Sequence, residues 1–297
     1  MLPVARPGLR EALEQVVATT DLGARGQADP VAVARDWSDP LDQELAGLLS
    51  SSLALGSAMV ARDNAREALR RIGGRPSESL DDVATVERAL GSWVHRFYRA
   101  PHVARLLVGA RAMQRAHGGL GVRFGALWQR HGALEPTLEA WVDEIQAAGW
   151  GSEPLDAAAR HLLPVPTRGG SASKRLMLFL RWMVRPDDGV DLGLWAGQVP
   201  ASALVMPVDV HVLRMAQNVG LTTERTASWR AALEITRGLG AFRPGDPVFY
   251  DFALCHLGMV GDCASRRDEV RCDGCGVRPV CVHWAPSARG AKRVHTG

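Results

Sequence analysis

The fold class of this chain is decided by residues 39–72, which read DPLDQELAGLLSSSLALGSAMVARDNAREALRRI. The stretch opens at Asp39-Pro40, an aspartate suited to capping a helix followed by a proline suited to its first turn. Leucines then recur at the spacing of one helical face, and the apolar run continues to Met59. This pattern predicts one long helix or two consecutive helices over Leu41–Ile72.

The same helical periodicity returns along the chain, whereas the alternation typical of strands is scarce. Pairs of glycines at 73–74, 118–119 and 169–170 mark breaks between the expected elements. We therefore expect an all-α protein. The further helices are expected over Asp82–Tyr98, Val103–Ala116, Leu134–Ala148, Pro154–Leu162, Val210–Val219, Ala227–Gly238 and Pro247–Met259.

The composition is that of a globular protein. The chain has 297 residues, of which 46% are hydrophobic, enough for one large domain or two smaller ones. The sequence begins with no apolar signal segment and contains no run of apolar residues long enough to span a bilayer. These features predict a soluble cytoplasmic protein with no membrane partner.

The basic residues are almost all arginine. Of 35 lysines and arginines, only Lys174 and Lys292 are lysine, and the net charge is +3. Arginine can replace lysine as a point charge, but it does not become a neutral amine nucleophile. Lys292 lies in a polar tail, so Lys174 is the lysine that suggests a chemical role.

Four of the five cysteines form a group near the end of the chain, Cys263-x8-Cys272-x2-Cys275-x5-Cys281. Without a secretion signal, such a group indicates a bound metal or iron–sulfur cluster rather than disulfides. Four thiolates suit a [4Fe–4S] cluster or tetrahedral zinc, and free or regulatory thiols are a third alternative. Zinc ribbons usually contain two CxxC pairs and this chain has one, which favours [4Fe–4S]. The fifth, Cys255, is expected to be a buried apolar side chain.

The spacing of Cys272, Cys275 and Cys281 resembles the C-terminal loop of endonuclease III-type DNA glycosylases, which binds a [4Fe–4S] cluster with four cysteines. Its first spacing is eight residues here, where that family typically has six. Residues 206–216, MPVDVHVLRMA, resemble the segment that carries the essential aspartate of the helix–hairpin–helix DNA glycosylase superfamily. The residues Pro-Val-Asp-Val-His are especially similar to those of the 8-oxoguanine glycosylases. Residues 163–195 also look like a widespread bacterial family of unassigned function, a divergent branch of the same superfamily.

The resemblance implies that Asp209 is catalytic. Breaking an N-glycosidic bond develops positive charge on the deoxyribose, and a carboxylate at a helix N-terminus stays ionised to stabilise it. The alternative is that Asp209 is a plain helix cap. His211 is expected to be structural.

Residues 168–175 read RGGSASKR, and the spacing from Gly170 to Lys174 resembles the hairpin of bifunctional glycosylases, whose lysine is the nucleophile. The hairpin's second glycine is Ala172 here. The resemblance implies that Lys174 attacks the sugar and forms a Schiff base; the alternative is a helix-terminal lysine that pairs with a phosphate or carboxylate. A turn of small residues at a helix start also offers N–H groups to DNA phosphates. The expected DNA contacts are Gly169, Gly170, Ser171, Ser173, Arg175 and, from the cysteine loop, Arg271.

The resemblance further implies a two-lobed helical DNA-glycosylase-like fold. Residues 40–190 would form a helical-barrel lobe with a degenerate hairpin, and residues 1–39 and 191–297 a second lobe with Asp209 and the cysteine loop 263–281. The implied function is that of a base-excision-repair DNA glycosylase with AP-lyase activity. It would act as a monomer on double-stranded DNA with a damaged or modified base, in association with the bacterial nucleoid.

The alternative is a non-catalytic nucleic-acid-binding iron–sulfur protein on the same fold. It is favoured by the missing standard hairpin and by Ser52, which stands where the family has a gap-filling glutamine.

Overall fold

The computed structural model describes residues 7–260, 263 and 266–284. In these ranges the regular elements are helices, apart from one antiparallel hairpin of β1 (Val94–His95) and β2 (Tyr98–Arg99). The prediction of an all-α chain is therefore confirmed. No helix of the described part is long and apolar enough to cross a membrane.

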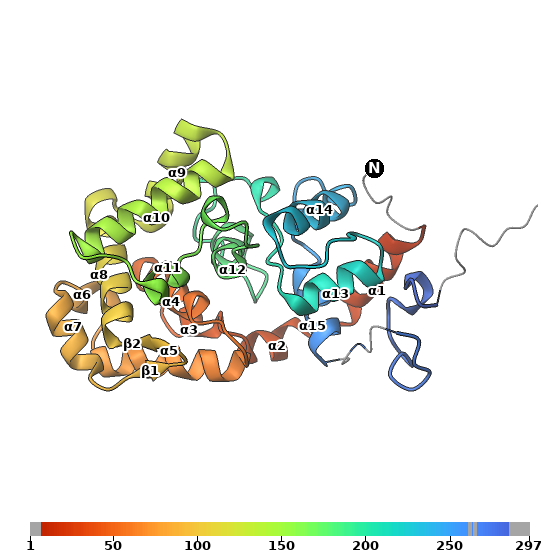
Figure 1. Ribbon diagram of the computed structural model, residues 1–297, viewed down its shortest axis with the longest axis horizontal. Helices are drawn as coiled ribbons and strands as arrows, with labels where there is room; N and C mark the ends of the chain where they lie inside the picture. The colour runs from red at the N-terminus through yellow and green to blue at the C-terminus, as the bar shows by residue number, and fades with distance from the viewer. Residues whose placement is uncertain (1–6, 261–262, 264–265, 285–297) are drawn as a thin grey trace, which may run out of the picture. The chain divides into compact units, whose positions relative to one another are not determined.

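The chain divides into two compact units, which Figure 1 labels by their helices. Unit 1 comprises residues 1–20 and 205–297, and unit 2 comprises residues 21–204. In unit 1 the helices are α1 (Leu9–Thr19), α13 (Val210–Asn218), α14 (Trp229–Gly240), α15 (Asp251–Val260) and the short η3 (Arg278–Val280). In unit 2 they are α2 (Leu22–Ala28), α3 (Ala32–Arg35), α4 (Pro40–Ser52), α5 (Ala58–Ile72), α6 (Pro76–Ser79), α7 (Val83–Leu90), α8 (Ala100–His117), α9 (Leu120–His131), α10 (Leu134–Trp150), α11 (Ala157–Leu162), η1 (Pro166–Arg168), α12 (Lys174–Val184) and η2 (Ala201–Ala203).

The stretch 39–72 folds as two consecutive helices, α4 and α5, rather than as one. Asp39 caps α4 as its sequence predicts, and its carboxylate accepts the N–H of Leu41 at 2.8 Å. The leucines of α4 are buried, whereas Met59 at the start of α5 is 57% exposed. The second helix ends at Gly73, the first glycine of the predicted break.

Several element boundaries differ from those expected. The helix predicted over Asp82–Tyr98 ends at Leu90, because Gly91 adopts a positive φ of 57° and the hairpin follows. The helix α9 was not among those expected. The helix expected from Pro247 begins four residues later, at Asp251.

Residues 21–39 belong to unit 2, together with residues 191–204, whereas the expected lobe was 40–190. The helix α3 packs against α4. Arg35 also donates to the carboxylate of Asp187 at 2.6 Å and to the backbone oxygen of Asp191 at 2.5 Å. Asp191 is itself fully buried and accepts from Arg181 at 3.0 Å and from Arg185. These contacts fasten both segments to α12.

A buried carboxylate organises the interior of unit 2. Glu44 on α4 is 5% exposed and accepts four hydrogen bonds, each 2.7–2.8 Å long. Two come from the first backbone N–H groups of α9, which has no side-chain cap of its own. The others come from Gln114 on α8 and from the indole of Trp195. Glu44 thus joins three helices and the segment after α12.

The helices α8 and α10 pack unusually closely and lie side by side in Figure 1. A Cβ on Gly109 would lie 2.3 Å from the backbone oxygen of Ile145, and one on Gly149 would lie 2.1 Å from that of Arg105. Only glycine allows these backbones to approach so far. This contact sets the position of α10, which lines the pocket described below.

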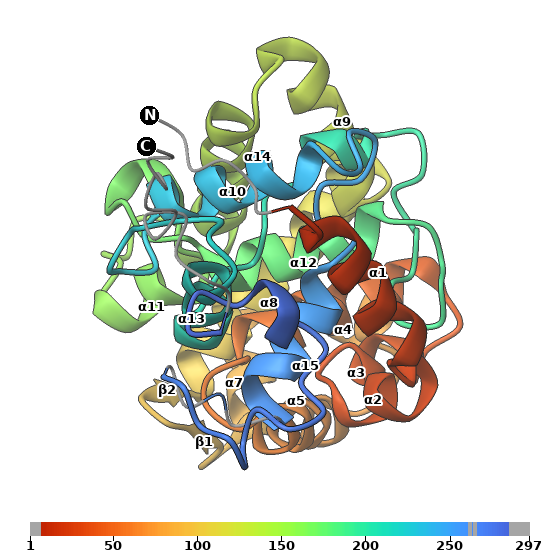
Figure 2. The ribbon, with the colours of Figure 1, turned by 90° about the vertical axis from the view of Figure 1, so that its right-hand side faces the viewer.

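In unit 1, hydrogen bonds and helix packing connect the N-terminal helix with helices from the last third of the chain. Glu14 on α1 accepts from Tyr250 at 2.6 Å and from Arg243 at 3.1 Å. The helix α1 also contacts α15, as Figure 2 shows, and α15 packs against α13. The N-terminal helix is therefore an integral part of the unit that carries Asp209.

Candidate functional site

Lys174 is the first residue of α12, which follows a turn of small residues in unit 2. The turn starts with η1 and Gly170, whose N–H donates to the backbone oxygen of Pro166 at 2.9 Å. Ser173 precedes the helix in a left-handed conformation with φ 48°, and its N–H donates to the hydroxyl of Ser171 at 3.0 Å. Lys174 itself is half-buried.

The predicted DNA contacts in this turn differ in exposure. Gly169, Gly170 and Ser171 are exposed, whereas Ser173 is buried. Arg168 anchors the turn to α10 through Asp143, whose two carboxylate oxygens each lie 2.6 Å from it. This bond raises the pKa of Arg168. The exposed part of the turn is thus held in place at one end by an ion pair.

The structure places Arg175 in the interior of unit 2 rather than at the surface. The residue is 5% exposed, and its guanidinium donates to the backbone oxygen of Ser52 at 3.0 Å. It also donates to the hydroxyl of Tyr98 and to the backbone oxygen of His161. The arginine next to Lys174 therefore holds three distant segments together, and its charge is not available to a phosphate in this structure.

His161 is held in its neutral form by this arrangement. Its Nδ1 lies 2.7 Å from the hydroxyl of Tyr98 and 3.1 Å from Nη2 of Arg175. Partial burial, together with the nearby charge of Arg175, lowers the pKa of His161 to about 4. Because a guanidinium only donates, Nδ1 accepts and the ring proton resides on Nε2.

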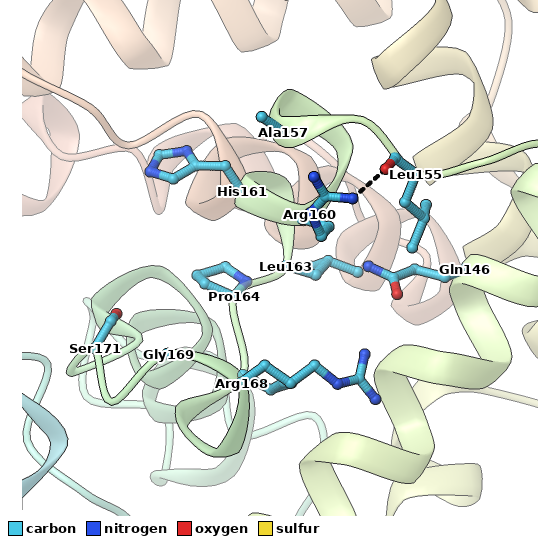
Figure 3. A pocket seen from close by; sticks show the side chains of 11 residues that line it. Gln146, Leu155, Ala157, Arg160, His161, Leu163, Pro164, Arg168, Gly169 and Ser171 are labelled. Carbon is cyan, nitrogen blue, oxygen red and sulfur yellow. Dashed lines mark hydrogen bonds between the residues drawn. The ribbon is translucent and has the colours of Figure 1, made fainter.

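Beside the turn lies a pocket of about 340 Å³, shown in Figure 3. Its wall is made by α10, Leu155 before α11, α11 itself and the segment between α11 and Ser171. Five side chains of the wall are apolar, and five are polar: Gln146, Arg160, His161, Arg168 and Ser171. The pocket and the predicted hairpin therefore share residues, although no pocket was predicted from the sequence.

One sequence signal for this pocket existed. Gln146 follows Val142 by four residues and Ile145 by one, on the buried face of α10. A polar residue at an apolar position of a helix needs a partner. The sequence contained that anomaly, but it did not show which segment faces Gln146.

Asp209 caps α13 in unit 1. One of its carboxylate oxygens accepts the N–H groups of His211 and Val212, each at 2.9 Å. These donors and the positive end of the helix favour a negative charge at this position. His211 lies 3.3 Å from Arg214, one turn along the same helix. Asp209 therefore has the geometry of a helix cap, which is also the geometry expected of an ionised carboxylate at a catalytic site.

All four cysteines of the predicted cluster loop lie in unit 1 within the described ranges, and Cys281 is buried. The side-chain amide of Asn218 donates to the sulfur of Cys263 at 3.1 Å. Burial raises the pKa of Cys275, and backbone N–H groups of Val277 and Arg278 act in the opposite direction by favouring its thiolate. N–H groups directed at sulfur are typical of the surroundings of iron–sulfur ligands.

The types of donor in this loop fit a metal or iron–sulfur centre. As they stand, however, no three or more Cys, His, Asp or Glu side chains of the described residues are grouped so as to hold a metal ion. Arg271, the predicted DNA contact from this loop, is exposed, and its N–H donates to Asp268 at 2.9 Å. Two other arginines, Arg267 and Arg278, lie over the ring of Trp284, at 4.4 Å and 3.9 Å from its centre.

The predicted catalytic residues lie in different units: Lys174 belongs to unit 2 and Asp209 to unit 1. No curated protein and no solved structure matches this chain. A family model described as "Protein of unknown function (DUF2400)" matches residues 29–260, which is 232 of the 297 residues. The match covers more than half of the chain, including Lys174 and Asp209 but not the cysteine loop, and the chain therefore belongs to the DUF2400 family.

Proposed function

We propose that this protein is a base-excision DNA glycosylase with AP-lyase activity, in which Lys174 is the nucleophile and Asp209 stabilises positive charge on the sugar. The observation that carries the proposal is the place of both residues at helix starts. Lys174 opens α12 after an exposed turn of small residues, and Asp209 caps α13. Both lie in segments that resemble those of the helix–hairpin–helix glycosylases.

In the proposed reaction, the neutral Nζ of Lys174 attacks C1′ of the deoxyribose. The bond between C1′ and the base breaks, and the base leaves with the electron pair and takes up a proton. The amine then loses its protons as the sugar ring opens, which leaves a C=N Schiff base between lysine and sugar. Elimination from this adduct breaks the strand on the 3′ side. Asp209 acts while positive charge develops on the sugar, before the Schiff base forms.

Double-stranded DNA with a damaged or modified base is the proposed substrate of a monomer that associates with the bacterial nucleoid. Gly169, Gly170 and Ser171 are exposed, so this turn can lie against a DNA backbone, although the N–H groups of both glycines are used within the turn on the backbone oxygen of Pro166. The exposed Arg271 suits a phosphate oxygen. Ser173 supports the turn from within, and Arg175 supports α12. Neither is part of the proposed DNA surface, because both side chains are buried.

The four cysteines would hold a [4Fe–4S] cluster, or zinc in the alternative form of the proposal. The ligands would be Cys263, Cys272, Cys275 and Cys281. When bound, the cluster supplies a covalent cross-link that keeps the loop and its arginines in one shape. The hydrogen bond of Asn218 to Cys263 supports this assignment, because it links the loop to the end of α13.

Borohydride trapping tests the nucleophile. The reagent reduces the C=N bond of a Schiff base, so the wild-type protein is expected to become covalently linked to an oligonucleotide that carries an abasic site or a removable base. Lys174→Arg should abolish the adduct and leave DNA affinity unchanged. Lys292→Arg is the matched control, because it alters the other lysine of the chain. An adduct that persists in Lys174→Arg, or that no substrate produces, would refute the lyase assignment.

A non-catalytic nucleic-acid-binding protein on the same fold is the second candidate. It is favoured by the cap of α13, because Asp209 is accounted for structurally by its bonds to His211 and Val212. For this candidate, Lys174→Arg changes neither DNA affinity nor any strand cleavage. The same pair of variants therefore separates the two functions.

A further inference from the structure

Gln146 has an amide that the fold leaves unused. The residue is 7% exposed, yet its carboxamide makes no hydrogen bond with any residue in the described part of the chain. Gln114 on the neighbouring helix is equally buried but donates to Leu41 at 2.9 Å and to Glu44 at 2.8 Å. Neither amide atom of Gln146 is fully enclosed, so the group stays accessible from the pocket, where a ligand can bond to it.

The amide of Gln146 is directed into the pocket. Figure 3 shows its side chain extending from α10 toward Leu163, with Arg168 on the other side of the space. The charge of Arg168 is matched by Asp143, whereas the exposed Arg160 donates to the backbone oxygen of Leu155. Leu163, beside Gln146, is apolar. The part of the pocket next to Gln146 therefore suits an uncharged group, and the volume of 340 Å³ lies in the range of small-molecule sites.

The chemistry of the amide narrows the class of ligand. A primary amide presents one acceptor oxygen and one N–H donor side by side. Its complement is a group with an N–H next to a C=O, which is the lactam edge of uracil, thymine and guanine. A flat heterocycle of this kind also covers apolar walls well. We propose that this pocket binds a nucleobase by its lactam edge, through two hydrogen bonds with Gln146.

This inference goes beyond the proposed function and depends on it in one respect only, the source of the base. Gly169 and Ser171 line the pocket and also belong to the turn that leads to Lys174. A base taken from DNA and a free nucleoside present the same lactam edge. The experiment therefore includes both sources.

Calorimetric titration with uridine and N3-methyluridine tests the lactam contact, because the methyl group removes the N–H and leaves the rest of the nucleoside. Uridine is expected to bind at least about tenfold more tightly than N3-methyluridine, because this is the ratio expected when a two-bond contact to a base is lost. In Gln146→Leu this preference should disappear. The same comparison with deoxyuridine and N3-methyldeoxyuridine in single-stranded oligonucleotides identifies DNA as the source, if the preference appears only there.

Thermal unfolding shows that the variant is folded. Gln146→Leu should unfold near the wild-type temperature, because the amide that it removes makes no hydrogen bond in the described part of the chain, whereas the control Gln114→Leu loses two hydrogen bonds and should unfold at a lower temperature. If neither uridine nor the oligonucleotide is preferred over its methylated form, or if Gln146→Leu keeps the preference, the proposal is wrong. If no preference is found but borohydride traps the protein through Lys174, the pocket proposal fails and the lyase assignment stands. If the preference is found but no adduct forms, the lyase assignment fails and the pocket proposal stands.

Discussion

The carboxylate of Asp209 has two properties that can be separated by substitution, its hydrogen bonds and its charge. It accepts two N–H groups at the start of α13, which any good cap residue can do. Its negative charge is what the proposed chemistry requires. Asparagine caps helices about as well as aspartate but carries no charge.

Asp209→Asn is therefore expected to keep the stability of the protein and to lose base excision. Its free energy of unfolding in urea should lie within about 0.5 kcal/mol of wild type, whereas Asp209→Ala should lose about 1 kcal/mol with the cap. Base release from a damaged duplex should be abolished in both variants. Full activity in Asp209→Asn would show that Asp209 is a cap and nothing more.

The residues at the helix starts were predictable because their signals are local. Asp39 and Asp209 each bond to an N–H two residues away, so a few letters of sequence describe the whole interaction. Arg175 shows the opposite case. Its partners on Ser52, Tyr98 and His161 come from three other parts of the chain, and only the tertiary structure reveals that it lies inside.

At the scale of elements, α9 shows why a helix can escape prediction. Gly119 precedes it and supplies no side-chain cap. The acceptors for its first N–H groups come instead from Glu44, which lies 76 residues before Leu120. The signal for the start of α9 is therefore in another helix, and the local sequence offers only a glycine pair that reads as a break.

Removing this acceptor should destabilise unit 2 strongly. Glu44→Ala leaves the donors on Leu120, Gly121, Gln114 and Trp195 buried without their acceptor. Each such donor costs roughly 1 kcal/mol or more, so we expect a loss of at least about 3 kcal/mol in the free energy of unfolding. Chemical denaturation followed by tryptophan fluorescence measures this loss.

The exposed Glu153 provides the control for that variant, because Glu153→Ala should change stability by no more than about 0.5 kcal/mol. Equal stability of the two variants would contradict the role assigned to Glu44. Backbone amide exchange adds a second readout, since the first turn of α9 should lose protection in Glu44→Ala before the rest of unit 2 does.

At the scale of the whole molecule, the two units carry different parts of the proposed function. The family match extends over unit 2 from residue 29 and into unit 1 as far as residue 260, and so it stops before the cysteine loop. The sequence predicted a division into a continuous and a discontinuous lobe, and the chain does divide into such units, at 20 and 204 rather than at 39 and 190. Periodicity does not reveal the long-range bonds of Arg35 to Asp187 and to the backbone of Asp191, which connect residues near the two ends of unit 2.

The cysteine loop makes the strongest prediction at this scale, because a bound cluster would affect unit 1 and not unit 2. Protein purified without oxygen is expected to be brown and to contain four irons per chain, and Cys272→Ser should lose most of this iron. Cys255→Ser is the matched control, since Cys255 lies on α15 outside the predicted ligand set. Elemental analysis decides between the alternatives, because one zinc per chain would replace the cluster with a tetrahedral site.

Removal of the metal should then expose unit 1 to proteolysis within 263–281 while unit 2 stays resistant, since its core is closed by Glu44 and the aromatic side chains around Trp195. Equal resistance of the loop with and without metal would mean that the cysteines do not hold it in shape.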